Sequence, residues 1–131
     1  MVRKGLLWIG LAALTSACLG SNDNQKADDA TATFFKEMAA KQYAQIYAES
    51  STDLQQTATS DQFVSMMQQF DQLPPCQAPV KKLDIQTQTV KDGVLRSQGY
   101  TQACGATTIQ ETVTILVSNG TAKLAGFKFN S

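Results

Sequence analysis

The sequence contains no histidine, and this absence narrows the chemistry open to the protein. Histidine is the usual general base near neutral pH and also the commonest metal ligand. The chain also lacks a glycine-rich phosphate loop, a nucleophile elbow and any group of acidic residues at metal-binding spacing. We therefore expect no metal, no cofactor and no histidine-based catalysis.

Long apolar runs and an excess of charge are absent as well. The apolar stretch of residues 5–14 is about half the ~20 residues that a transmembrane helix needs, so no permanent span is expected. Eleven basic residues balance eleven acidic ones. Because a near-neutral chain lacks the basic patch that attracts nucleic acids, no nucleic-acid partner is expected.

The N-terminus has the three parts of a secretory signal peptide. Arg3 and Lys4 form the positive start, residues 5–14 form the apolar centre, and small residues precede Cys18. This pattern predicts that residues 1–17 are a signal peptide. An ordinary cleaved signal, in which Cys18 is incidental, is the alternative.

The end of this segment, Thr15-Ser16-Ala17-Cys18, resembles the lipobox of bacterial lipoproteins, although Thr15 stands where leucine is usual. The resemblance implies that Cys18 receives a diacylglycerol, becomes the new N-terminus and is acylated there. Stable membrane anchoring needs more than one acyl chain, because each buried methylene contributes only ~0.8 kcal/mol and a single chain binds the membrane marginally. Leu19, rather than aspartate, follows the cysteine. This implies a lipid anchor in the outer membrane of a bacterial cell envelope, facing the periplasm.

The chain after the signal is long enough for one domain and not two. Its formal charge is −2, because the signal holds two of the eleven basic residues and none of the acidic ones. Residues 18–28 are polar without a hydrophobic period, which predicts a flexible tether. Residues 29–131 are then expected to form the single domain.

Two cysteines remain if Cys18 is lipidated. Cys76 and Cys104 are 28 residues apart and match no zinc pattern. In an exported chain, such a pair predicts a disulfide. Two free thiols are the alternative.

The first half of the domain has helical spacing. Asp28 or Asp29 can cap a first helix, and Lys41-Gln42 is a possible break before a second one. Apolar residues recur at helical intervals along this stretch: Phe34, Met38, Ile46 and Tyr47.

A further helix has the clearest signals in the chain. Thr59 and Gln62 predict a capping box, in which each side chain satisfies a backbone donor of the other residue. The apolar face follows at i, i+3, i+4 and i+7 with Phe63, Met66, Met67 and Phe70. Leu73-Pro74-Pro75 is expected to end it, because proline cannot continue the hydrogen-bond ladder.

After Pro79 the period changes to two, which predicts strands. Asp92-Gly93, Cys104-Gly105-Ala106 and Asn119-Gly120 are turn signals that divide this half into four strands. Helices followed by a meander predict an α+β fold, with the N-terminal helices packed on one face of a four-stranded antiparallel sheet.

This order of elements resembles the cystatin-like roll of the nuclear-transport-factor-2-like superfamily. More narrowly, it resembles uncharacterised bacterial envelope proteins with that roll, over about residues 29–131. The resembling residues are Phe34, Tyr43 and Tyr47 in the helices, Glu111-Thr112-Val113-Thr114, and Leu124-Ala125-Gly126-Phe127. Enzymes on this roll commonly place an acid and a histidine in the cone between helices and sheet, and this chain has no histidine to offer.

The candidate polar groups for that cone are Glu111, Tyr100, Tyr43 and Tyr47. For the tyrosines, a core role with one solvated end is the structural alternative. Two functions follow. One is a non-catalytic accessory lipoprotein that binds a small apolar ligand or an envelope protein. The other is a small hydrolase or isomerase that uses Glu111 and Tyr100. The oligomeric state does not follow from the sequence.

Whether the cone is open or filled distinguishes these two functions. An open cavity with Glu111 at its base would favour a ligand or enzyme site. A cone filled by apolar side chains would favour binding of a protein partner through the outer surface. The residues that would fill it are Phe34, Met38, Phe63 and Met67.

The surroundings of Glu111 depend on strand register. A regular hairpin at Asn119-Gly120 places Glu111 opposite Lys128, as a plain cross-strand ion pair. A bulge at Gly126 places it opposite Phe129 instead, and we favour this register because it buries Phe127 and Phe129. Glu111 would then lie among apolar groups with a raised pKa, in need of a tyrosine or backbone partner.

Overall fold

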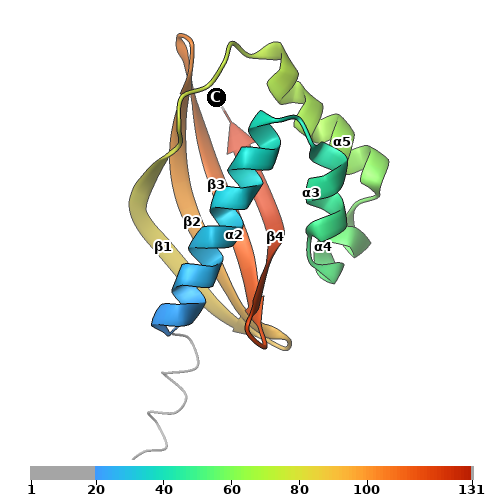
Figure 1. Ribbon diagram of the computed structural model, residues 1–131, viewed down its shortest axis with the longest axis vertical. Helices are drawn as coiled ribbons and strands as arrows, with labels where there is room; N and C mark the ends of the chain where they lie inside the picture. Colours follow the sequence, from blue (N-terminus) through green and yellow to red (C-terminus); the bar gives the residue numbers. More distant parts are fainter. Residues whose placement is uncertain (1–19, 131) are drawn as a thin grey trace, which may run out of the picture.

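The computed structural model describes residues 20–130 and has the predicted α+β architecture, with helices on one face of an antiparallel sheet (Figure 1). No helix in the described part is long and apolar enough to cross a membrane. Cys18 and the predicted signal peptide lie outside the described residues. The elements are α2 (Ser21–Ala39), α3 (Tyr43–Glu49), α4 (Thr52–Thr57), α5 (Ser60–Met67), the 3₁₀ helix η1 (Gln68–Gln72), β1 (Val80–Val90), β2 (Gly93–Cys104), β3 (Thr107–Ser118) and β4 (Thr121–Asn130).

The prediction of a flexible tether over residues 18–28 is wrong from Ser21 onward, where α2 begins. Ala27 is completely buried, and Thr31 and Phe34 continue the same buried face one and two turns later. The polar composition of residues 21–28 concealed this helix, because a single small alanine marks its buried side. The N-terminal half of α2 is therefore part of the folded domain.

The predicted helix boundaries further on are confirmed. Lys41 adopts a positive φ of 59° between α2 and α3, as expected for a break at Lys41-Gln42. Thr59 and Gln62 form the complete capping box at the start of α5. The last turn before the prolines, η1, tightens into a 3₁₀ helix.

The sheet is an antiparallel meander in the order β1-β2-β3-β4. Asn119 and Gly120 both have positive φ, 50° and 78°, as the two central residues of a type I′ hairpin turn require. A bulge then shifts the β3–β4 register between Thr114 and Ile115, so that Glu111 pairs with Phe129. The favoured register is thus confirmed, and the ion pair with Lys128 is excluded because Lys128 pairs with Thr112.

A second irregularity lies in the edge strand β1. Lys81 pairs with Tyr100 and Ile85 with Gln98, so three residues of β1 face the single residue Gly99 of β2. The Gln98 amide donates hydrogen bonds into this bulge, to the carbonyls of Lys82 at 2.6 Å and Asp84 at 3.0 Å. The strand is exposed along almost its whole length.

The space between the helices and the sheet is filled by apolar side chains. Phe34, Met38, Phe63 and Met67 are all buried, and Met67 is completely inaccessible to solvent. Phe34 contacts Phe127 of β4 with ring centroids 4.9 Å apart. The four apolar side chains expected to fill the cone are therefore buried in it, while Glu111 lines a depression beside them.

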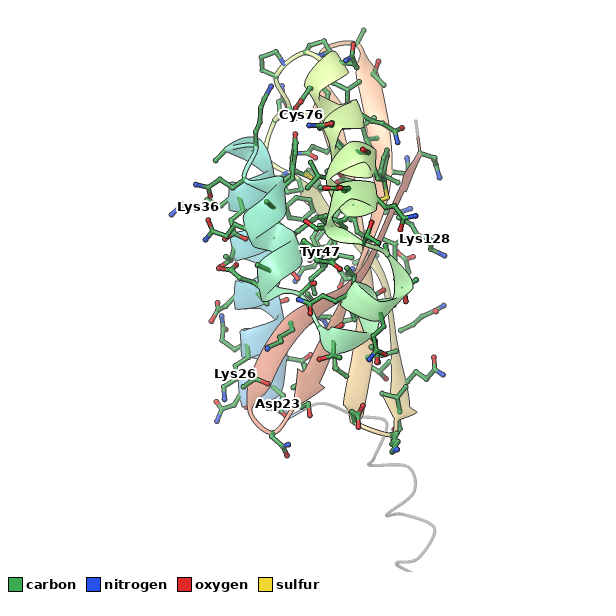
Figure 2. The ribbon with its side chains drawn as sticks, turned by 90° about the vertical axis from the view of Figure 1, so that its right-hand side faces the viewer. Asp23, Lys26, Lys36, Tyr47, Cys76 and Lys128 are labelled. Carbon is green, nitrogen blue, oxygen red and sulfur yellow. A yellow bond between two sulfur atoms is a disulfide. The ribbon has the colours of Figure 1, made fainter. Side chains whose placement is uncertain are left out.

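Two further links hold the layers together. The predicted disulfide joins Cys76, just before β1, to Cys104 at the end of β2. On the inner face of the sheet, the buried Arg96 pairs with Asp28 of α2 at 2.8 Å. Figure 2 shows that Cys76 lies at one end of the molecule and Asp23 at the opposite end.

Candidate functional site

Glu111 is the most unusual ionisable group in the described chain. It is only 3% exposed, and neither carboxyl oxygen has a hydrogen-bond partner among the described residues. Its cross-strand neighbours are Tyr100 on β2 and Phe129 on β4. Burial among these aromatic groups raises the pKa of Glu111 to about 7. The raised pKa expected from the bulged register is present, whereas the expected tyrosine or backbone partner is not.

Glu111 lines a depression of about 660 Å³ at the end of the sheet. The lining combines residues from several elements: Met66 and Gln69 from the helices, and Lys82, Asp84, Gly99, Gln110, Thr112, Phe127, Lys128, Phe129 and Asn130 from the strands. Its charged groups are therefore mixed, and no second titratable group contacts the Glu111 carboxyl by a hydrogen bond or ion pair in the described residues.

Tyr100 is buried directly opposite Glu111, yet it lines a different depression of about 410 Å³ between α2 and the start of β1. Its ring packs edge-on against Phe35 at 5.2 Å. Burial raises the pKa of Tyr100. Beside it, burial alone would raise the pKa of Asp28, but the hydrogen bond and charge of Arg96 lower it overall. Tyr100 and Glu111 are thus neighbours that do not share an opening.

The other two predicted pocket residues have structural roles. Tyr43 donates a hydrogen bond to Asp71 at 2.7 Å, and burial together with this bond raises the pKa of Tyr43. The Tyr47 hydroxyl donates to backbone carbonyls of Gln55 and Ala58 at 3.0 and 2.7 Å. In Figure 2, Tyr47 lies in the middle of the helical layer. None of the three tyrosines therefore lines the depression that Glu111 lines.

A separate groove of about 360 Å³ lies at the mouth of the cone, between the end of α2, η1 and the end of β2. Its lining is mostly apolar: Phe35, Met38, Ala39, Phe70, Leu73, Pro74, Pro75 and Cys76, with Lys41, Tyr43 and Gln102 as polar members. Gln102 is only 7% exposed. Its amide nitrogen donates to the carbonyl of Gln77 at 3.0 Å, which leaves Oε1 as an acceptor without a partner in the described chain.

Sequence reasoning missed Gln102. Alternation along β2 places Gln102 on the same sheet face as Tyr100. Its pairing with Ile109 of β3, which is buried, confirms that this face is the inner one. The alternation of side chains along β2 was therefore the sequence signal that could have identified Gln102 as an inward-facing residue.

Two acidic residues, Glu37 of α2 and Glu49 of α3, approach each other in the helical layer. Burial of Glu37, together with a hydrogen bond to Glu49 and the charge of Glu49, raises the pKa of Glu37. They flank a small depression of about 200 Å³. No group of three or more potential metal ligands occurs within residues 20–130.

Comparison with known proteins adds no assignment. The chain matches no known protein family, and no curated protein matches its sequence.

Proposed function

We propose that the protein is a lipid-anchored, non-catalytic binding module of a bacterial cell envelope. The observation that carries this proposal is the filled interior. Phe34, Met38, Phe63 and Met67 occupy the cone in which a roll of this kind would hold a catalytic dyad. Binding is then left to the depressions and exposed strands around the core.

The start of α2 supports the proposed anchor geometrically. The helix begins at Ser21, only three residues after Cys18, so acyl chains on Cys18 would hold this end of the domain close to the membrane. Asp23 lies at that end and Cys76 at the opposite one (Figure 2). The end that carries Cys76 would therefore face away from the membrane, toward the periplasm.

Anchoring is tested by Cys18→Ser, with Asn22→Ala on the exposed start of α2 as the matched control. We expect Cys18→Ser to leave the membrane fraction while the control stays there, and wild type to carry acyl groups in its intact mass. A membrane-bound Cys18→Ser protein together with an unacylated wild type would refute the lipid anchor.

Binding without catalysis is tested in gently solubilised membranes. If the protein is a binding module, wild type and Glu111→Gln should retain the same bound partner or ligand in equal amounts. A hydrolytic or isomerase activity that is present in wild type and absent from Glu111→Gln would contradict the proposal.

One observation favours a small hydrolase or isomerase as a second candidate. A buried carboxyl with a pKa of about 7, in the wall of a depression, is poised for proton transfer near neutral pH. The separate opening of Tyr100 weighs against a joint role for the two residues. A substrate screen in which Tyr100→Phe retains activity and Glu111→Gln loses it would favour this second function, with Glu111 acting alone.

A further inference from the structure

The exposed large apolar side chains of residues 20–130 gather on one short stretch of β1. Val80 is 63% exposed, Ile85 is 47% exposed, and Leu83 is fully exposed at 100%. Single apolar residues are normal on a protein surface, whereas a group of them on one element indicates an interaction site. The start of β1 is therefore the part of the described surface best suited to contact another protein.

The same stretch has a free hydrogen-bonding edge. β1 is the first strand of the described sheet and pairs with β2, so its other side faces solvent (Figure 1). Gln98 of β2 donates to the carbonyls of Lys82 and Asp84, which shows that these two carbonyls point toward β2. Because backbone groups alternate along an extended strand, the N–H and C=O of Leu83 point to the free edge. Such an edge can accept another strand.

The charged residues on either side of Leu83 decide which strand fits this edge. Lys82 and Asp84 lie over Gly99, since the Lys82 Cδ and Asp84 Oδ1 atoms are 3.3 and 3.2 Å from the position of a Cβ on that glycine. Lys82 donates to the side chain of Gln110 at 3.2 Å. The Asp84 carboxylate forms no ion pair in the described chain. Read in opposite directions, two copies of Lys82-Leu83-Asp84 are therefore complementary in charge.

We propose that β1 pairs with β1 of a second copy of this chain, antiparallel and around a two-fold axis at Leu83. Leu83 then lies opposite Leu83 of the second copy, and Lys82 of each copy lies opposite Asp84 of the other. An axis at Lys82 or at Asp84 would instead oppose like charges, which is destabilising. The charges that usually protect an edge strand thus favour this register over its neighbours. The dimer goes beyond the proposed function and does not depend on it.

This pairing has a consequence for anchored copies. β1 begins just after Cys76, and Cys76 and Asp23 mark opposite ends of the molecule (Figure 2). Antiparallel strands run in opposite directions, so the two starts of α2 would lie at opposite ends of the dimer. Both lipid anchors would then reach one membrane when the strands lie along its surface. A single copy would stand with its Cys76 end outward, and dimer formation would turn it onto its side.

Charge exchange tests the proposed contact in the full-length chain in mild detergent, with the dimer Kd measured by sedimentation equilibrium. Lys82→Glu and Asp84→Lys each oppose like charges twice in the dimer, so each should raise the Kd about tenfold or more. An equimolar mixture of the two variants should recover the wild-type Kd, because each chain then meets opposite charges in the other. Lys91→Glu, in the exposed turn after β1, is the matched control and should dimerise like wild type.

Cysteine cross-linking tests the register. Leu83→Cys places two thiols across the two-fold axis, where paired Cα atoms are ~5.5 Å apart and within disulfide range. Val80→Cys is the matched control on the same strand. It pairs with Gln86 of the second copy, so its two thiols are about 20 Å apart. Mild oxidation should link Leu83→Cys into a dimer and leave Val80→Cys at the background of wild type.

Two results would overturn the proposal: no linked Leu83→Cys dimer, or a wild-type dimer whose Kd is unchanged in Lys82→Glu. Linking of Leu83→Cys in membranes to a different envelope protein, without the self-linked species, would assign the edge to a foreign strand and also reject a second copy. Circular dichroism verifies folding, and if Asp84→Lys fails to fold, Lys82→Glu and the cross-links still decide. None of these results refutes the proposed function, which Cys18→Ser and Glu111→Gln test separately.

Discussion

Glu111 on β3 lies directly opposite Phe129 on β4, and one bulge residue is responsible for this pairing. The ring of Phe129 packs against Phe70 of η1 with centroids 4.6 Å apart, which closes an aromatic wall on one side of the carboxyl. On the other side, Tyr100 packs against Phe35. The carboxyl is thus held in apolar surroundings that oppose its ionisation.

The first prediction is that Glu111→Gln changes how stability depends on pH. The folded pKa of Glu111, about 7, lies above the ordinary value of 4.5. Between these values the unfolded chain releases a proton that the folded chain retains, so wild type loses stability as pH rises through this window. The full loss is ~3 kcal/mol, because one pKa unit corresponds to ~1.4 kcal/mol.

Glutamine does not titrate, so the stability of Glu111→Gln relative to wild type should rise by ~3 kcal/mol between pH 4 and pH 8. Urea unfolding across this range measures the difference. Asp92→Asn, on the exposed turn after β1, is the control and should run parallel to wild type. A parallel curve for Glu111→Gln would show that the carboxyl is solvated.

The second prediction concerns the disulfide between Cys76 and Cys104, which closes a loop with a sequence separation of 28. The chain-entropy model assigns a loop of this length ~3–4 kcal/mol. We expect the reduced protein to unfold at correspondingly lower urea concentration. A Cys76→Ala/Cys104→Ala variant should be insensitive to reductant. Equal midpoints for oxidised and reduced wild type, with the bond confirmed by non-reducing peptide mapping, would contradict this estimate.

The third prediction tests the link between α2 and the sheet. Arg96 is 2% exposed, whereas Asp28 is partly exposed, so solvent screens part of their attraction. Asp28→Asn leaves a buried guanidinium without its counter-charge and should cost about 1–2 kcal/mol. Arg96→Met in the same background should restore part of this loss, because it removes the unpaired charge.

This pair also gives a pH effect of opposite sign to that of Glu111. The pKa of Asp28 is lowered by Arg96, so its contribution is present above the ordinary value of 3.8 and is lost as pH falls through the folded pKa. Comparison of Asp28→Asn with wild type by urea unfolding at pH 7 and pH 3 measures it. A difference that is larger at pH 3 than at pH 7 would contradict the assignment.

Local chemistry explains how far the sequence could predict this fold. The capping box at Thr59, the Asn119-Gly120 turn and the bulge next to Gly126 are each decided by a few neighbouring residues, and all three are confirmed. The first turns of α2 could not be predicted in this way. Their helical state depends on burial of Ala27 against distant elements, and polar neighbours hide that contact.

The candidate site shows the same division. The burial of Glu111 followed from strand parity and register, whereas the separation of its depression from that of Tyr100 depends on how α2 crosses the sheet. The bulge at Lys82–Asp84 has no glycine in β1 itself, and the glycine that faces it, Gly99, lies on β2. Its stabilising group, Gln98, lies on the partner strand.

The fourth prediction follows from that bulge. The Gln98 side chain is buried and donates to the carbonyls of Lys82 and Asp84, which hold β1 against β2 at the sheet edge. Gln98→Met keeps the length of the side chain but removes both bonds to β1, together with a third to the Gly99 carbonyl, and it should cost ~1–2 kcal/mol. Gln86→Met, at an exposed position of β1, is the control and should change stability by less than ~0.5 kcal/mol. Because the lost bonds are local to the edge, hydrogen exchange should accelerate in β1 far more than in β3. Uniform acceleration across the sheet would mean that Gln98 supports the whole core rather than the bulge.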